Sequence, residues 1–187
     1  MIYNGSIDFM GTEVGMLDRV KQFRQNIFYG FLDVDKSFLS AYLDERELRL
    51  FNQLKKSEKN HSIAVAKGVR SDLAPEEDES LVKAALFHDI GKIEKPLNLA
   101  EKSLAVIMSK VMGSALSRLD HMAFIGSYLY HGQRGERILR NEKIFEEKPL
   151  LYTLVGTHHF RAEELKVHEK EELLAYHTLL KKHDDRN

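Results

Sequence analysis

The sequence contains no cysteine among its 187 residues, and that absence excludes several classes of protein. Disulfide-stabilised folds, zinc sites built on cysteine and enzymes with a thiol nucleophile all require this residue. Long apolar runs are also missing, and none approaches the roughly 20 residues that a helix needs to cross a bilayer. The first residues lack the basic and apolar segments of a secretory signal peptide. We therefore expect a cytoplasmic protein with no membrane partner.

An excess of one charge sign is absent too, because 28 Lys and Arg residues are balanced by 29 Asp and Glu residues. A formal net charge of −1 argues against binding to a nucleic-acid duplex, which needs a basic surface. Apolar residues make up 43% of the chain, enough for the core of one ordinary domain. Several apolar side chains of the N-terminal third fit this core or, alternatively, the surface of a homodimer. They are Phe23, Ile27, Phe28, Phe31 and Phe38.

Proline is scarce, with three residues in the chain, and the stretches between them have helical periodicity. The clearest apolar stripe consists of Leu104, Ile107, Met108, Val111, Ala115 and Leu119. No segment shows the sustained alternation of apolar and polar residues that is typical of a strand. We therefore predict an all-α fold, with helices over 17–29, 36–43, 46–55, 58–72, 77–89, 101–118, 121–131, 134–141, 148–159 and 169–183.

Local signals mark the ends of two of these helices. Asp44 followed by Glu47 resembles a capping box at a helix start. Gly91 and Pro96 are expected to end the helix over 77–89.

Five polar side chains lie in line with apolar helical stripes, so we expect them to point into the bundle. They are His61, His88, His131, His158 and Asp184. A buried polar group without a partner costs a few kcal/mol, and a buried carboxylate costs more. Convergence on a metal would satisfy all five groups, and imidazole and carboxylate are the ligands that remain without cysteine. Taken singly, each histidine would also fit a satisfied core or surface position.

The adjacent pair His88 and Asp89 is a more specific signal, within the segment His-Asp-Ile-Gly-Lys that ends at Lys92. Adjacent helical residues do not share a face, so both can reach one site only near a helix end. We expect Gly91 to supply that end.

These residues, in this order and at these separations, resemble the HD superfamily of metal-dependent phosphohydrolases, of the HDIG type. The resemblance covers about residues 58–187 and implies a helical HD domain there. Residues 1–57 would form an N-terminal arm and a helical extension packed on that core.

The resemblance also implies roles for individual residues. His61, His88, Asp89 and Asp184 match the minimal metal site of the family, and Asp89 matches the carboxylate that bridges two ions. His131 and His158, together with His159, match the additional histidines of two-metal members. Lys92 matches a lysine near the substrate phosphate, although a solvated lysine at a helix end is the simpler alternative.

The chemistry of such a site agrees with this assignment. Two cations about 3.5–4 Å apart can share a hydroxide and hold phosphate oxygens for in-line attack. Asp89 and Lys92 are the expected catalytic residues, because Lys92 would neutralise the charge that develops on the phosphoryl oxygens. Arg134 is the best candidate among the arginines after His131 to bind phosphate, although that series also fits a solvated helix face. We expect two divalent transition-metal ions, of iron, manganese, zinc, cobalt or nickel.

The expected function is therefore hydrolysis of a phosphoester or phosphoanhydride, in a small-molecule substrate such as a nucleotide, by a metal-bound hydroxide. Two alternatives stay open at this point: a one-metal 5′-nucleotidase, and a non-catalytic module that binds metal or nucleotide. Asp185 competes with Asp184 for the last ligand position, and we choose Asp184 because it extends the face that contains Leu173 and Leu180. Three further histidines match no family position and are expected at the surface; they are His121, His168 and His183.

Overall fold

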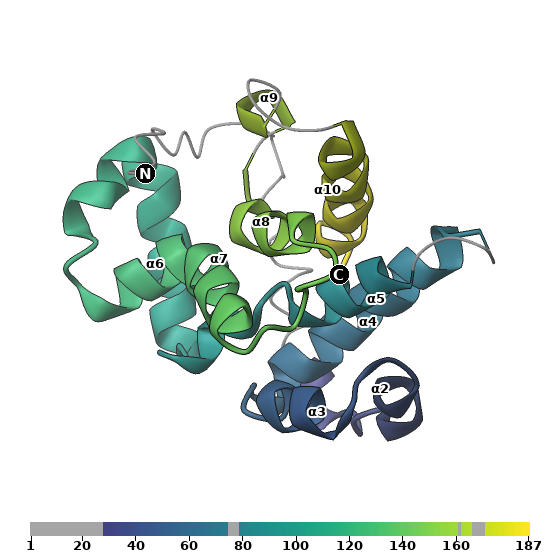
Figure 1. Cartoon of the computed structure of the whole chain (residues 1–187). Helices are drawn as coiled ribbons and strands as arrows, with labels where there is room; N and C mark the ends of the chain where they lie inside the picture. Colours follow the sequence, from purple (N-terminus) through teal and green to yellow (C-terminus); the bar gives the residue numbers. More distant parts are fainter. Residues whose placement is uncertain (1–27, 75–78, 161, 166–170) are drawn as a thin grey trace.

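The computed structural model describes residues 28–74, 79–160, 162–165 and 171–187. Every regular element within these ranges is helical, which confirms the predicted all-α fold. The first half contains α2 (Lys36–Tyr42), α3 (Glu45–Phe51), α4 (Lys56–Asp72), α5 (Ser80–Phe87) and the 3₁₀ helix η1 (Ile90–Ile93). The second half contains α6 (Leu99–Met112), the 3₁₀ helix η2 (Gly113–Leu119), α7 (Ala123–Asn141), α8 (Leu150–Thr157), α9 (Ala162–Leu165) and α10 (Glu171–Asp184) (Figure 1).

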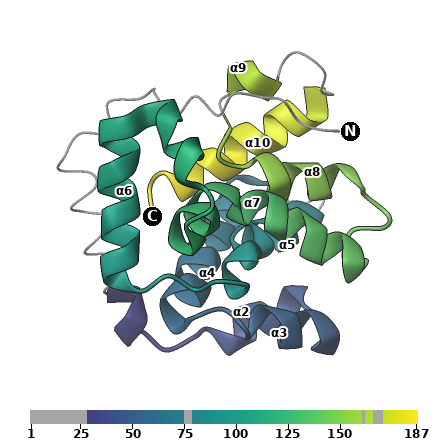
Figure 2. The same cartoon turned by 90° about the vertical axis from the view of Figure 1, so that its left-hand side faces the viewer.

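Within the described residues, the predicted N-terminal extension contains the short helices α2 and α3, which lie together at one end of the molecule in both views (Figures 1 and 2). The Asp44 carboxylate accepts from the Glu47 amide and the Glu47 carboxylate accepts from the Asp44 amide, so the predicted capping box is confirmed. Phe51 of α3 meets Phe87 of α5 edge to face, with ring centroids 6.1 Å apart. The extension therefore shares the core of the helices that follow it. The division at residue 57 stays a prediction, and the expected helix 17–29 and arm 1–15 lie almost wholly outside the described residues.

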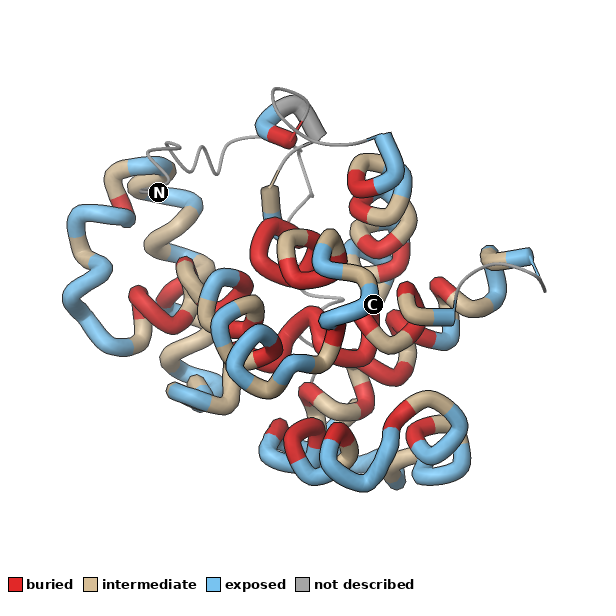
Figure 3. The backbone as a smooth tube through the Cα atoms, viewed as in Figure 1, coloured by how far each residue is buried: buried red, intermediate tan, exposed pale blue. Residues whose placement is uncertain are grey.

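The main core lies where α4, α5, α8 and α10 meet, and buried residues gather there (Figure 3). α5 is the most deeply buried helix, because six of its eight residues are apolar and buried. α4 packs along α5 on one side and α10 packs against α4 and α8. The helices that contain most of the candidate ligands are therefore held together by one continuous apolar cluster.

A second, smaller core joins α6 and η2 to α7. The prediction of one helix over residues 101–118 is wrong, because α6 and η2 divide this segment. The α-helix ends at Met112 because Gly113 adopts φ 53°, a backbone conformation that residues other than glycine rarely adopt. The buried face of α6 is formed by Ala105 with Met108 and Met112. Leu104, Ile107 and Val111 of the predicted stripe are exposed.

The segments 121–131 and 134–141, predicted as two helices, form the single helix α7. Tyr130, with φ −118° and ψ 15°, introduces a kink immediately before His131. The division expected from the sequence therefore corresponds to a change of direction within one helix.

None of the described helices combines the length and the apolar character required to span a bilayer.

Candidate metal centre

The candidate ligands come from five helices, and three helix ends and one helix kink bring most of them together. His88 and His158 are the C-cap residues of α5 and α8, Asp184 is the last residue of α10, and His131 follows the kink of α7. His61 lies in the middle of α4, away from any helix end or kink.

Asp89 reaches the site because α5 ends at Phe87 and η1 begins only at Ile90, so His88 and Asp89 lie between the two helices, where adjacent side chains can reach one site. Gly91 does not end α5 by a left-handed conformation, since Gly113 is the one glycine with positive φ among the described residues. Its role is close packing: a Cβ at Gly91 would overlap the carbonyl oxygen of His131 on α7. The absence of that Cβ allows η1 to lie directly against α7, and so brings Asp89 to His131.

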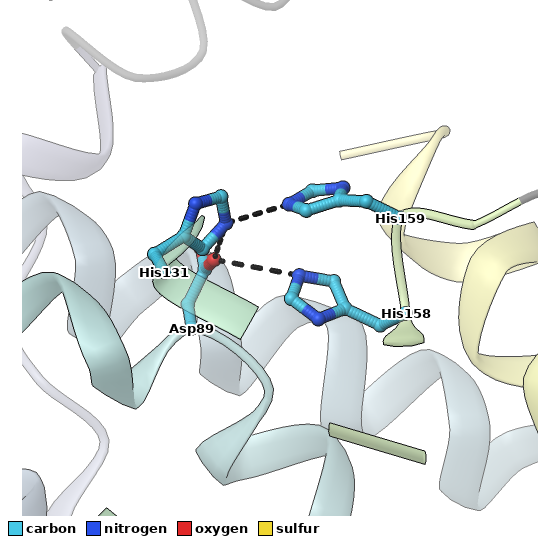
Figure 4. Close-up of side chains that lie close together, drawn as sticks. All are labelled: Asp89, His131, His158 and His159. Carbon is cyan, nitrogen blue, oxygen red and sulfur yellow. Dashed lines mark hydrogen bonds and ion pairs between the residues drawn. The ribbon is translucent and has the colours of Figure 1, made fainter. Parts of the chain in front are cut away.

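One cluster consists of Asp89, His131, His158 and His159, whose ligand atoms all lie within 4.8 Å of one another (Figure 4). His131 Nε2 lies 3.2 Å from Asp89 Oδ1, and His158 Nε2 lies 3.9 Å from the same oxygen. His159 is the exposed member, and its Nε2 lies 2.6 Å from His131 Nε2.

A second cluster consists of His61, His88 and Asp184. His61 Nε2 and His88 Nε2 lie 3.0 Å and 3.5 Å from Asp184 Oδ1. The same two nitrogens lie 3.8 Å and 3.5 Å from Asp89 Oδ2. Asp89 therefore lies between the clusters, with Oδ1 facing one and Oδ2 facing the other.

Three of the imidazoles are oriented by their own helices. Nδ1 of His88, His131 and His158 lies 2.7, 3.0 and 2.7 Å from the carbonyl oxygen three residues earlier. Because a carbonyl can only accept, Nδ1 carries the proton, and in the neutral ring Nε2 then presents its lone pair to the site. Nε2 of His88 and of His158 is buried with no hydrogen-bond partner. Two buried Nε2 atoms without hydrogen-bond partners, beside two carboxylates, are the arrangement that a bound metal cation would satisfy.

The charges of the site are strongly coupled. Burial disfavours the charged form of His88, but the carboxylates of Asp89 and Asp184 outweigh it and raise the His88 pKa to about 9. Burial, with repulsion from His88 and His131, lowers the pKa of His158 to about 3. Burial opposes ionisation of Asp89 as well, yet Lys92 and the imidazoles hold the pKa of that carboxyl well below its usual range. The carboxylates of Asp89 and Asp184 against the single ammonium group of Lys92 thus give the centre a net negative charge when its histidines are neutral.

Lys92 ion-pairs with Asp89 Oδ2, and its Nζ lies 3.3 Å from Glu58 Oε2. The sequence did not single out Glu58, although Glu58 lies three residues before His61 and so shares a face of α4 with it. The other Glu58 oxygen binds Lys102 of α6. No sequence signal marks Lys102, because its approach to α4 is a tertiary contact.

Arg134 lies one turn after His131, and its Nε pairs with Glu94 Oε2 at 3.8 Å. Arg137 binds the same glutamate at 2.6 Å. A role for Arg134 in phosphate binding therefore stays a prediction.

The remaining histidines divide between surface and core. His121 is exposed, as expected, and His168 lies outside the described residues. His183, expected at the surface, is buried, with Nε2 2.7 Å from Asp72 Oδ2. Asp185 pairs with Lys181 at 3.5 Å, whereas Asp184 lies beside His61.

In a comparison with known families, the family described as HD domain matches residues 59–184. No curated protein and no solved structure matches the chain.

Proposed function

The chain belongs to the HD domain family, a superfamily of metal-dependent phosphohydrolases, and from that premise we propose that it hydrolyses a phosphoester or phosphoanhydride bond at a two-metal centre. The substrate class that we propose is a small phosphorylated molecule such as a nucleotide.

The proposal assigns His61, His88 and Asp184 to one ion, His131, His158 and His159 to the other, and Asp89 to both. The separation of the two Asp89 oxygens between the two clusters supports this division. Imidazole and carboxylate donors without sulfur fit iron, manganese, zinc, cobalt or nickel. When bound, such ions supply a hydroxide nucleophile near neutral pH and neutralise phosphate charge.

The observation that carries the proposal is the pair of orphaned Nε2 atoms of His88 and His158. A buried nitrogen without a partner costs roughly 1–3 kcal/mol, and the two lie on separate helices that meet at Asp89. His158, whose lowered pKa keeps it neutral, would bear that cost without compensation in a purely structural role, whereas metal coordination removes it.

The ammonium group of Lys92 serves as the cation next to the reacting phosphate. Its contacts with Asp89 and Glu58 hold a proton on Nζ, because two carboxylates raise the Lys92 pKa above its usual range. A lysine that stays charged can bind a phosphoryl oxygen and stabilise the charge that develops there.

Metal content and hydrolysis, measured together, test the proposal. The chain is purified without a tag or chelator, its metals are counted by elemental analysis, and manganese-loaded protein is assayed with bis(p-nitrophenyl) phosphate. We expect two ions per chain, one of them lost in His131→Ala and in His158→Ala. The rate of hydrolysis should fall about a hundredfold or more in both variants, which corresponds to an activation free energy higher by about 3 kcal/mol.

His121→Ala is the matched control, because this exposed histidine lies outside both clusters and should leave metal content and rate unchanged. One ion per chain, insensitive to both cluster variants, would favour a one-metal nucleotidase. Metal or nucleotide binding without turnover would favour a non-catalytic module, and absence of metal after supplementation would overturn the two-metal site.

A further inference from the structure

Glu58 joins two lysines at the edge of the candidate centre. Its side chain is 5% exposed, its Oε2 lies 3.3 Å from Lys92 Nζ, and its Oε1 binds Lys102 Nζ. Lys92 also binds Asp89, so four charged groups of alternating sign extend from the centre of the site to α6. A buried carboxylate is costly, and here two ammonium groups offset that cost.

Lys102 is the outermost group of this series, and its geometry suits a ligand that arrives from solvent. It projects from the first turns of α6, and its side chain is 28% exposed while the carboxylate that it binds is buried. An ammonium group has three N–H donors, and Glu58 is the one partner that the structure describes for it. The contact with Glu58 therefore positions Lys102 and leaves N–H donors of its ammonium group for a ligand.

The balance of charge changes when Asp89 becomes a metal ligand. Lys92 and Lys102 then share one counter-charge, that of Glu58, and one positive charge is left over at the rim. The two ammonium groups are separated by a single carboxylate, a spacing that two phosphates joined through one bridging atom can also span. A substrate with a single phosphate would engage Lys92 and leave Lys102 unused.

We propose that Lys102 binds the phosphate next to the one held at the metal centre, and that Glu58 is the positioning residue for Lys92 and Lys102. The substrate is then a compound with at least two linked phosphates. This inference rests on the proposed function and narrows it. The alternative is that Glu58 and Lys102 only tie α6 to α4.

Anion binding to the manganese-loaded full chain distinguishes these possibilities. Calorimetry gives the dissociation constants of orthophosphate and of imidodiphosphate, whose bridging nitrogen resists hydrolysis. In Lys102→Gln the preference for imidodiphosphate over orthophosphate should fall about tenfold, because one charge-assisted contact to the second phosphate is lost. Lys102→Arg should retain most of the preference. Lys110→Gln, on the exposed surface of the same helix, is the matched control and should retain all of it.

A second measurement avoids substitution altogether. Imidodiphosphate should protect Lys102 of the unmodified protein from an amine-reactive label, detected by mass spectrometry, and should leave Lys110 labelled. Equal preference in Lys102→Gln and wild type, or labelling of Lys102 that imidodiphosphate does not reduce, would overturn the inference. If the wild type still binds two metals and hydrolyses bis(p-nitrophenyl) phosphate, the proposed function survives that result. If it binds neither metal nor orthophosphate, both fail.

Discussion

At the scale of single residues, the site is governed by charges that are buried in compensating pairs. Glu58 is an example, because burial alone would raise its pKa and keep it neutral. Lys92 and Lys102 outweigh that effect and lower the Glu58 pKa to about 2, from an ordinary value of 4.5. A carboxyl with a lowered pKa stabilises the folded state at pH values above its unfolded pKa, and the contribution is lost as the pH falls towards the folded pKa.

Glu58→Gln should therefore remove a pH-dependent part of the stability. The lowered pKa corresponds to about 3 kcal/mol, present in full above about pH 4.5 and lost between there and pH 2. Urea unfolding of chelator-treated protein should show a constant deficit in the variant from pH 7 to pH 5, and a deficit that shrinks below pH 4.5. Glu45→Gln, at an exposed carboxylate of α3, is the control and should show no comparable deficit. A deficit independent of pH would mean that Glu58 acts through packing and not through its charge.

At the scale of elements, the positions of helix ends decide which side chains meet. The sequence predicted most helices and the group of side chains that meets at the candidate centre, because apolar periodicity and the position of a polar residue within a stripe are local properties. It could not predict that α6 ends at Met112, or that Leu104, Ile107 and Val111 face away from the second core, because Ala105, Met108 and Met112 form an equally regular stripe. It also assigned Gly91 to the end of α5, whereas the contact that requires glycine is with α7.

Gly91→Ala tests whether this contact positions the centre. The added Cβ would overlap the His131 carbonyl and would approach the Gly135 amide nitrogen to 2.6 Å. Backbone cannot give way as a side chain can, so η1 and α7 must move apart. We expect the free energy of unfolding, measured in urea, to fall by about 1–3 kcal/mol. Manganese should also bind more weakly, because Asp89 and His131 separate.

Gly30→Ala provides the comparison, since a Cβ there meets nothing within 4 Å. Wild-type stability and wild-type metal affinity in Gly91→Ala would contradict the close approach of η1 and α7.

At the scale of the whole molecule, the centre lies where helices distant in sequence converge. His61 and Asp184 are 123 positions apart, yet their side chains lie 3.0 Å apart. A contact between α4 and α10 also fixes the position of α10. Buried His183, the residue before Asp184, binds Asp72 of α4. The sequence indicated the candidate ligands but not the contact between His183 and Asp72. His183 was expected at the surface, since nothing local distinguishes it from a solvated histidine. A site built from five helices that are distant in sequence should couple metal binding to global stability.

Removal of metal should consequently destabilise the entire chain and not only the site. A ligand that binds only the folded state at a hundred times its dissociation constant adds about 2.7 kcal/mol. For a chain of this length that corresponds to a shift in Tm of about 5–10 °C. We expect scanning calorimetry to show this drop after chelation and its reversal when manganese is returned. In His158→Ala the shift should be much smaller, because one ion has lost a ligand, whereas in His121→Ala it should match the wild type. Equal Tm with and without chelator, in protein shown to have contained metal, would mean that the helices hold the centre together unaided and that the orphaned imidazoles cost the fold little.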